Sequence, residues 1–386
     1  MKMPKGAATR VALALLSVIG ATSMSAAKTF VYVSNAQDGN IDAYTMDTGT
    51  GALTPIGKTE AAKLVMPMTV SPSKQYLYAV IRSQPTRVLT YAIDPATGAL
   101  SQKAFAPLPD SMPYVSTDHT GRFLFTASYG GDKLAVSPIG ENGLVEAEAI
   151  QVIATGRNAH AILPDRSNKF VYATTLGANQ VLQFTFDANT GKLTPNEPPA
   201  VSPEAGHGPR HMALSPDNKN LYVLNELSGH VTRYAIDGAK GTLTLAESIS
   251  SVPAEAGLVW GAPQAPAGTT AAAAAPKDDK PKIWAADIQI TPNGKFLYST
   301  ERTTSKIALF MVAPETGKLT YVGNFSTETQ PRGIKIDPSG QYLVASGEKS
   351  DRLSVYKIDQ STGKLGEPSR YPVGNGANWV EIVDLQ

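Results

Sequence analysis

The stretch RHMALSPDNKNLYVLNE, residues 210–226, decides the fold because versions of it recur along the chain. It reads as a hydrophobic strand, a turn rich in Pro, Asp, Asn and Lys, and a second strand with an aromatic residue near its start. Related copies read MTVSPSKQYLYAVIR, YVSTDHTGRFLFTASY, HAILPDRSNKFVYATTL, ADIQITPNGKFLYSTER and RGIKIDPSGQYLVASGE. Each copy predicts a β-hairpin.

The copies recur at a nearly constant interval. The matched position is occupied by Tyr32, Tyr78, Phe125, Tyr172, Tyr222, Tyr298 and Val344. Successive spacings are 46 to 50 residues, except for 76 between the fifth and the sixth. The long interval contains GAPQAPAGTTAAAAAPKDDKPK, residues 261–282, which has no periodic apolar face and predicts a loosely held, low-complexity surface insertion.

A second turn phrase follows each hairpin. It reads DPATGAL at 94–100, DANTGKL at 187–193 and DQSTGKL at 359–365. Four short strands per ~45 residues, joined by hairpin turns, are typical of a β-propeller blade. The sequence therefore predicts an all-β, seven-bladed β-propeller that forms one domain over residues 28–386.

The two ends of the repeat predict how the ring closes. The first copy begins directly at FVYVSN, without a preceding strand, and the last copy is the lone strand NWVEIVD, residues 378–384. These halves complete one blade if the C-terminal strand pairs with the N-terminal strand. Such closure also removes exposed sheet edges.

The first 27 residues have the pattern of a secretory signal peptide. Lys2, Lys5 and Arg10 precede a short apolar stretch, and small residues precede a cleavage point near Ala27/Lys28. A retained membrane anchor is the alternative, but the apolar stretch is short for a bilayer. We expect a periplasmic or secreted protein without membrane attachment after cleavage.

Composition excludes several kinds of chemistry. The 386 residues contain no Cys, so thiol nucleophiles, disulfides and thiolate metal sites are absent. A net charge of +1 without a basic run argues against nucleic acid as a partner. No HExxH, G-x-S-x-G or phosphate-loop motif occurs, and Gly208-Pro209 between His207 and His211 prevents a zinc-binding helix. We predict neither a metal nor an organic cofactor.

Two positions in every blade should meet at one mouth of the central channel, since a hairpin brings the start of one strand beside the end of the next. They lie twelve residues before and four after the matched position. The first set is Met66, Pro113, His160, Arg210, Ala286 and Arg332, with Asn378 from the last strand; the second is Ala36, Arg82, Tyr129, Leu176, Glu226, Arg302 and Glu348. Positions that only stabilise a blade should be alike in every copy, and these are not. A rim ion pair of little energetic value is the plain alternative for Arg210 and Glu226.

The phrase GHGPRHMALSPDNKNLYVLNE, residues 206–226, resembles the hallmark segment of the seven-bladed propeller lactonases. This family contains bacterial 6-phosphogluconolactonase and the fungal carboxymuconate-lactonizing enzymes. NAHAILPDRSNKFVYATTLGANQV is similar to its His-bearing segment, and ADIQITPNGKFLYSTERTTSKIALF to a segment that usually contains Ser-Asn-Arg. The resemblance implies a lactonase acting on a sugar-type lactone, with site roles for His160, Arg210, Glu226 and Arg302. Together with the N-terminal pattern, it predicts an exported lactonase.

From the rim positions and this phrase together we predict two groups of site residues. The catalytic residues are Glu226 and His160, either of which could be the base or the acid. The substrate-binding residues are Arg210, Arg302, His211, Asn225, Tyr129 and Arg332.

Three departures from the family pattern accompany this prediction. Tyr114 stands where the family has a His, Glu301 stands where it has an Asn, and the insertion at 261–282 is unusual. An acid beside Arg302 should disfavour a phosphorylated or otherwise anionic substrate. FVYVSNAQDGNIDAY also resembles surface-layer propellers, so the alternative function is a non-catalytic exported propeller that acts as a binding or scaffold module.

Overall fold

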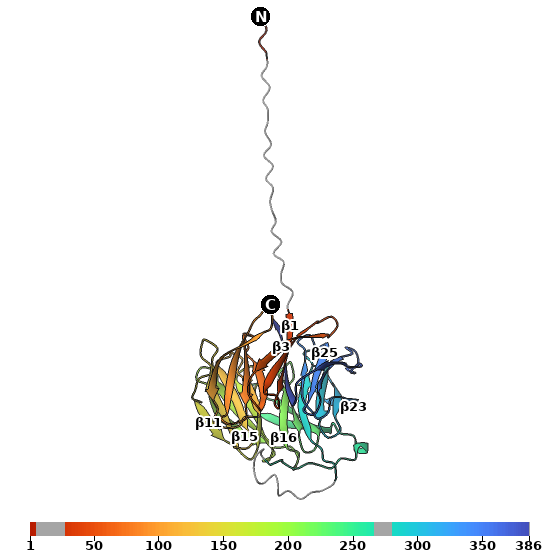
Figure 1. The fold of residues 1–386 in the computed structure, drawn as a ribbon. Coiled ribbons are helices and arrows are strands. Elements are labelled where there is room, and N and C mark those ends of the chain that lie inside the picture. Colours follow the sequence, from red (N-terminus) through yellow and green to blue (C-terminus); the bar gives the residue numbers. More distant parts are fainter. Residues whose placement is uncertain (5–27, 266–279, 386) are drawn as a thin grey trace.

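The computed structural model describes residues 1–4, 28–265 and 280–385, and nearly all of their regular structure is β-strand (Figure 1). The strands form seven four-stranded antiparallel sheets. A 3₁₀ turn, η1 (Ala254–Ala256), is the one helical element in the described part of the chain. The predicted all-β, seven-bladed β-propeller is confirmed.

Each blade runs from an innermost strand at the channel to an outer strand at the rim. The innermost strands are β28 (Ala377–Leu385), β4 (Val65–Val70), β8 (Tyr114–Thr117), β12 (Ala159–Pro164), β16 (Pro209–Leu214), β20 (Ala285–Ile290) and β24 (Pro331–Ile336). The second strands are β1 (Lys28–Asn35), β5 (Tyr76–Ile81), β9 (Phe123–Ser128), β13 (Phe170–Thr175), β17 (Asn220–Asn225), β21 (Phe296–Glu301) and β25 (Tyr342–Gly347). The third strands are β2 (Asn40–Met46), β6 (Arg87–Ile93), β10 (Lys133–Pro138), β14 (Gln180–Asp187), β18 (His230–Ile236), β22 (Lys306–Val312) and β26 (Arg352–Lys357). The outer strands are β3 (Leu53–Glu60), β7 (Leu100–Pro107), β11 (Gln151–Ala154), β15 (Lys192–Val201), β19 (Leu243–Ser250), β23 (Leu319–Ser326) and β27 (Ser369–Pro372).

The ring closes through the chain ends, as predicted. Strand β28 pairs antiparallel with β1, with Tyr32 opposite Glu381. Strand β28 also contacts β24 on one side and β4 on the other. Figure 1 shows the C-terminus beside the start of β1.

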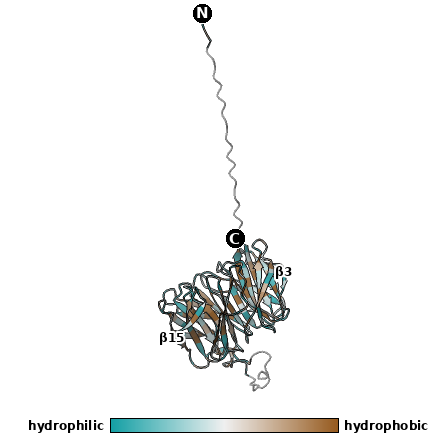
Figure 2. Ribbon diagram, turned by 90° about the vertical axis from the view of Figure 1, so that its left-hand side faces the viewer, coloured by the Kyte–Doolittle hydropathy of each residue, from teal (hydrophilic) through white to brown (hydrophobic). Residues whose placement is uncertain are grey.

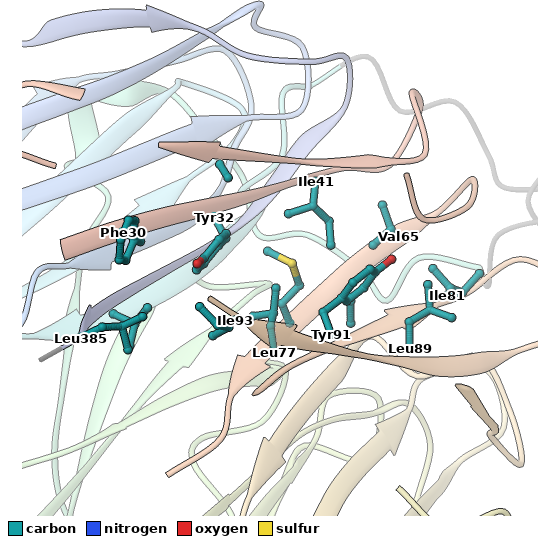
Figure 3. Close-up of a cluster of buried hydrophobic side chains, with 14 residues drawn as sticks. Phe30, Tyr32, Ile41, Val65, Leu77, Ile81, Leu89, Tyr91, Ile93 and Leu385 are labelled. Atoms are coloured by element: carbon teal, nitrogen blue, oxygen red, sulfur yellow. The ribbon is translucent and has the colours of Figure 1, made fainter. Parts of the chain in front are cut away.

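Apolar side chains fill the space between neighbouring blades. Phe30 and Tyr32 of β1 and Leu385 of β28 pack against Leu77 and Tyr91 of the next blade (Figure 3). Hydrophobic residues lie mainly along the strands within the ring, whereas the connecting turns are mostly hydrophilic (Figure 2). This packing is the main source of stability, because each sheet has two faces to cover.

The repeated aromatic residue connects neighbouring blades. Its hydroxyl donates to the carbonyl of the turn glycine in the following blade, at 2.6 to 3.2 Å. The pairs are Tyr32 with Gly98, Tyr78 with Gly143, Tyr172 with Gly241, Tyr222 with Gly317, and Tyr298 with Gly363. Each such bond is worth about 1 kcal/mol. Because the repeated tyrosine bonds to the next blade, the period found in the sequence reflects contacts between blades as well as within them.

The second turn phrase owes its residue types to local hydrogen bonds. In the copy at 94–100, the Asp94 carboxylate accepts from the amides of Ala96 and Thr97 at 2.8 and 2.9 Å. Gly98 has a φ of +72°, and a Cβ there would lie 2.2 Å from the Phe30 ring. Aspartate followed by glycine at this spacing therefore fixes the turn.

The ends of the insertion are held more firmly than the sequence indicates. The Gly261 amide donates to the Leu227 carbonyl at 2.8 Å, and Val259 forms a bridge with Lys282. The Tyr129 hydroxyl donates to the Gln264 carbonyl at 2.8 Å. The two ends of the insertion thus contact the propeller, whereas residues 266–279, on which most of the predicted low-complexity insertion falls, lie outside the described part.

The predicted signal peptide falls almost wholly on residues 5–27, which also lie outside the described part. Within residues 1–4, 28–265 and 280–385, no helix is long and apolar enough to cross a membrane.

Candidate active site at one mouth of the central channel

A β-bulge marks the channel end of most innermost strands. In β16, Pro209 pairs with Asn225 and Met212 with Val223, so two residues of β16 lie opposite one residue of β17. The same shift occurs in β20 between Ala285 and Ile288. Similar irregularities occur in β4, β12 and β24. A bulge breaks the alternation of faces and re-aims side chains. Two consecutive residues of one strand can therefore both reach the channel.

The bulged ends surround a cavity of about 580 Å³, which we call the mouth cavity. Nine residues of the two predicted sets line it: Met66, Pro113, His160, Arg210, Arg332, Arg82, Tyr129, Glu226 and Arg302. Ala36, Ala286, Leu176, Glu348 and Asn378 of those sets do not. The repeat positions thus converge at one mouth, as the hairpin geometry requires.

A carboxylate between two arginines forms the centre of the site. One oxygen of Glu226, Oε2, accepts from Nε of Arg210 at 2.7 Å and from Nη2 of Arg302 at 2.9 Å. Arg210 also donates to the Ala286 carbonyl, while Arg302 donates to the carbonyls of Trp284 and Ala285, each at 3.1 Å. Both guanidinium groups are therefore fixed before any substrate binds.

Burial and charge act against each other in this cluster. Arg210, Arg302 and Glu226 are 0%, 2% and 4% exposed. Burial and the neighbouring arginines Arg302 and Arg332 lower the pKa of Arg210 to about 9. Burial alone would raise the pKa of Glu226, but Arg302 and Arg210 outweigh it and hold that pKa below its usual value. At neutral pH the cluster contains two cations and one anion.

Beside this cluster, His160 supplies an imidazole that is uncharged at neutral pH. Burial, then Arg210 and His211, hold the pKa of His160 well below its usual value. The His160 ring stands edge-on to Tyr129 at 5.9 Å between centroids and to His211 at 5.2 Å. An uncharged imidazole at a cavity wall can accept a proton.

Two of the predicted binding residues lie away from the mouth cavity. Asn225 is fully buried, and its amide donates to the His230 carbonyl and to the Thr232 hydroxyl. His211 lies deeper in the channel, where its Nδ1 is 2.8 Å from Oδ1 of Asp287. The predicted contact of these two residues with substrate is therefore not supported: the side-chain amide of Asn225 fixes the turn after β17, and the bulge in β16 turns His211 toward Asp287.

Tyr129 and Arg332 do line the mouth cavity, as predicted. The Tyr129 hydroxyl is already bonded to Gln264, and Arg332 has a loose ion pair with Glu348 at 3.7 Å. Both side chains thus have polar groups near the space that a substrate would occupy.

Sequence reasoning missed Trp284 and the Asp287–His211 pair. The Trp284 ring lies 3.7 Å from the guanidinium carbon of Arg302, a cation–π contact that fixes that arginine. Trp284 precedes the rim position Ala286 by two residues, so strand alternation could have indicated it. Asp287 directly follows the rim position Ala286, so strand alternation predicts that its side chain lies on the opposite face of the strand. No signal in the sequence therefore indicated the Asp287–His211 pair.

Glu301 does not face the mouth cavity. Its carboxylate accepts from the amides of Trp284, Thr303 and Thr304 at 2.7 to 3.0 Å, which caps the turn after β21. The Glu301 carboxylate is therefore engaged by backbone amides of the adjoining turn. Its position gives no reason to expect that it disfavours a phosphorylated substrate.

This fold and this site agree with a family model described as the seven-bladed β-propeller lactonase, which matches residues 29–382. The chain belongs to the seven-bladed β-propeller lactonase family. The resemblance drawn from the sequence is confirmed, and the family supports the enzymatic function over the scaffold.

Similar proteins agree with this membership. The chain is 38% identical to the 6-phosphogluconolactonase of Serratia proteamaculans over 92% of this chain and 99% of that protein. It is 39% identical to the 6-phosphogluconolactonase of Erwinia tasmaniensis, over 93% and 99% respectively. The solved periplasmic gluconolactonase of Pseudomonas aeruginosa has the same fold, with a TM-score of 0.78, 24% identity, and coverage of 93% of this chain and 99% of that one.

Proposed function

We propose that this lactonase-family protein hydrolyses a sugar-type lactone in the mouth cavity. The proposal rests on two arginines, Arg210 and Arg302, that are both hydrogen-bonded to Glu226. One guanidinium nitrogen of Arg210 still has no partner among the described residues. Nη2 of Arg210 is buried and has no hydrogen-bond partner among the described residues. A donor held in place and not engaged by another group of the described residues is suited to a charge that develops only during the reaction.

In the proposed reaction His160 is the base. Its imidazole takes a proton from water while the water oxygen bonds to the lactone carbonyl carbon. The carbonyl electron pair moves to oxygen, where Arg210 stabilises the negative charge. When the tetrahedral intermediate collapses, the ring C–O bond breaks, and the leaving oxygen takes the proton back from His160. The product is the open-chain hydroxy acid.

Glu226 acts in this proposal through the arginines. The Glu226 carboxylate is already engaged by two guanidinium groups, whereas Nδ1 of His160 has no hydrogen-bond partner among the described residues. Oε2 of Glu226 instead sets the positions of Arg210 and Arg302. We therefore assign the base role to His160 and the positioning role to Glu226.

The charge of the mouth cavity favours an anionic or strongly polar substrate. Four arginines line it, Arg82, Arg210, Arg302 and Arg332, against the two carboxylates of Asp110 and Glu226. Asp110 is itself 3.3 Å from Lys133. A cationic cavity attracts carboxylate and phosphate groups. We propose gluconolactone-type substrates, with or without a phosphate.

An assay of the purified protein on δ-gluconolactone and 6-phosphogluconolactone tests this function. Proton release followed in weak buffer with a chelator present should show hydrolysis of at least one of them. His160→Gln should lower kcat by roughly 10²–10⁴, because the amide cannot take up the proton. Full activity of His160→Gln would refute the base assignment, and inactivity of the wild type on a wide lactone panel would favour the scaffold alternative.

We also propose that the protein is exported. The support is the basic, apolar and small-residue order of residues 1–27. Mass spectrometry of the protein expressed in a Gram-negative bacterium should give a chain that begins near Lys28 in the periplasmic fraction. A chain with the N-terminal 27 residues intact in the cytoplasm would contradict export.

A further inference from the structure

A second, smaller cavity lies inside the channel beyond the mouth cavity. It measures about 140 Å³, and His211, Asp287, Tyr114 and Trp379 are among the residues that line it. The Tyr114 ring packs edge-on to His211 at 5.1 Å, and the Trp379 ring to His211 at 5.7 Å. His211 is thus enclosed, with the inner cavity on one side and His160 of the mouth cavity on the other.

The Asp287–His211 contact fixes which nitrogen of His211 carries the proton. Burial would raise the pKa of Asp287, but His211 and the amides of Ile334 and Ile288 hold it below its usual value. Oδ1 of Asp287 also accepts from the Ile288 amide, and Oδ2 from the Ile334 amide, both at 2.9 Å. An ionised carboxylate can only accept, so Nδ1 of His211 must donate to it. Burial and Arg210 lower the pKa of His211 to about 4, so its Nε2 has a free lone pair at neutral pH.

Two ring nitrogens then remain without partners. Nε2 of His211 and Nδ1 of His160 are both buried, and neither has a hydrogen bond within the described part of the chain. Their rings are 5.2 Å apart between centroids, a separation that a small side-chain rotation or one bridging water can span. Buried polar atoms are nearly always hydrogen-bonded, and one acceptor and one donor satisfy each other.

We propose that Asp287 and His211 are positioning residues that fix the tautomer of His160. Asp287 holds the proton of His211 on Nδ1, and Nε2 of His211 accepts from Nδ1 of His160, directly or through water. Nε2 of His160 is then unprotonated and available to the mouth cavity. The inference rests on the proposed function only in that it takes His160 as the base. Over one complete turnover the relay has no net change in protons, because His160 takes one from water and returns it to the leaving oxygen. His211 and Asp287 keep their protonation states throughout.

The direct test is the tautomer of His160, which needs no substrate. The chain has five histidines, so ¹⁵N-histidine NMR of the full protein at neutral pH is tractable, with His160→Gln to assign the signal. The wild type should carry the His160 proton on Nδ1. His211→Phe, which keeps the aromatic packing but removes the acceptor, should move a large share of that proton to Nε2, and His211→Gln, whose amide oxygen can accept, should keep it on Nδ1.

Kinetics supply the second readout. His211→Phe and Asp287→Asn should each lower kcat by roughly 10²–10⁴ with little change in KM, by analogy with loss of the orienting aspartate in a catalytic triad. The double variant should lose no more than the worse single variant, because both act through one proton. His119→Gln, an exposed turn histidine at 2.8 Å from the Asp165 carbonyl, is the control and should keep full activity.

The outcomes separate the relay from the proposed function. An unchanged His160 tautomer in both His211→Phe and Asp287→Asn, or a wild-type proton on Nε2, overturns the relay. Should Asp287→Asn fail to fold because it also bonds two amides, His211→Phe decides alone. An active His160→Gln variant refutes the base assignment, while the tautomer measurement still decides the relay.

Discussion

Deletion of residues 376–386 is expected to abolish cooperative folding. The deletion removes β28, which supplies the innermost strand of the first blade and pairs with β1 along its whole length. Val380 and Ile382 pack on one neighbouring blade, and Val383 and Leu385 on the other. Burying each such side chain is worth about 1.5–3 kcal/mol, so the loss consumes most of a typical stability of ~5–15 kcal/mol. Circular dichroism and thermal melting measure the result.

The matched control is deletion of residues 266–279 with a short Gly/Ser join. It removes more residues than the first deletion but leaves the contacts of Gly261, Gln264 and Lys282 in place. Shortening the connection between Ala265 and Lys280 changes the entropy of loop closure by about 1 kcal/mol or less. A cooperative melt of the 376–386 deletion at the temperature of this control would mean that the ring does not depend on β28.

Glu226→Gln is expected to lower kcat by roughly 10²–10³, the second large effect. The substitution keeps the shape of the side chain but removes the one anion that holds Arg210 and Arg302 at 2.7 and 2.9 Å. Loss of one correctly placed oxyanion donor costs about this factor. Steady-state kinetics on the lactone found active in the assay measure it, with circular dichroism to show that the variant is folded.

Glu301→Gln is the matched control, since Glu301 precedes Arg302 and is equally buried. Its carboxylate caps a turn and does not line the mouth cavity. We expect a lower melting temperature and an unchanged kcat. Equal kcat values for the wild type and Glu226→Gln would show that the two arginines do not need the carboxylate for catalysis.

The repeat positions predicted which residues would meet at one mouth of the channel. His160, Arg210, Glu226 and Arg302 all occupy the two repeat positions, and all four line one cavity. They could be found because equivalent residues of a closed repeat must meet at the same mouth. Asn225 and His211 were predicted to bind substrate from the phrase at 206–226, in which each stands next to a rim position.

Local backbone geometry explains why Asn225 and His211 do not line the mouth cavity. Asn225 ends β17, and its amide is used up in bonds to His230 and Thr232. His211 and Asp287 occupy equivalent positions in successive blades, one residue beyond the rim, where regular alternation would send them away from the channel. The bulges in β16 and β20 bring them to it instead.

The sequence by itself determined the seven blades, the closure through β28, and the mouth at which chemistry-bearing residues gather. Those features follow from a period of about 46 residues and from the turn residues Asp and Gly, which act over a few positions. Only the tertiary structure decided that Glu226 bridges two arginines, that Trp284 supports Arg302, and that Asp287 meets His211. The contacts of Glu226 with Arg302 and of Asp287 with His211 join neighbouring blades. Side-chain direction at the bulges of β16 and β20 depends on the partner strand, which no local pattern of residues encodes.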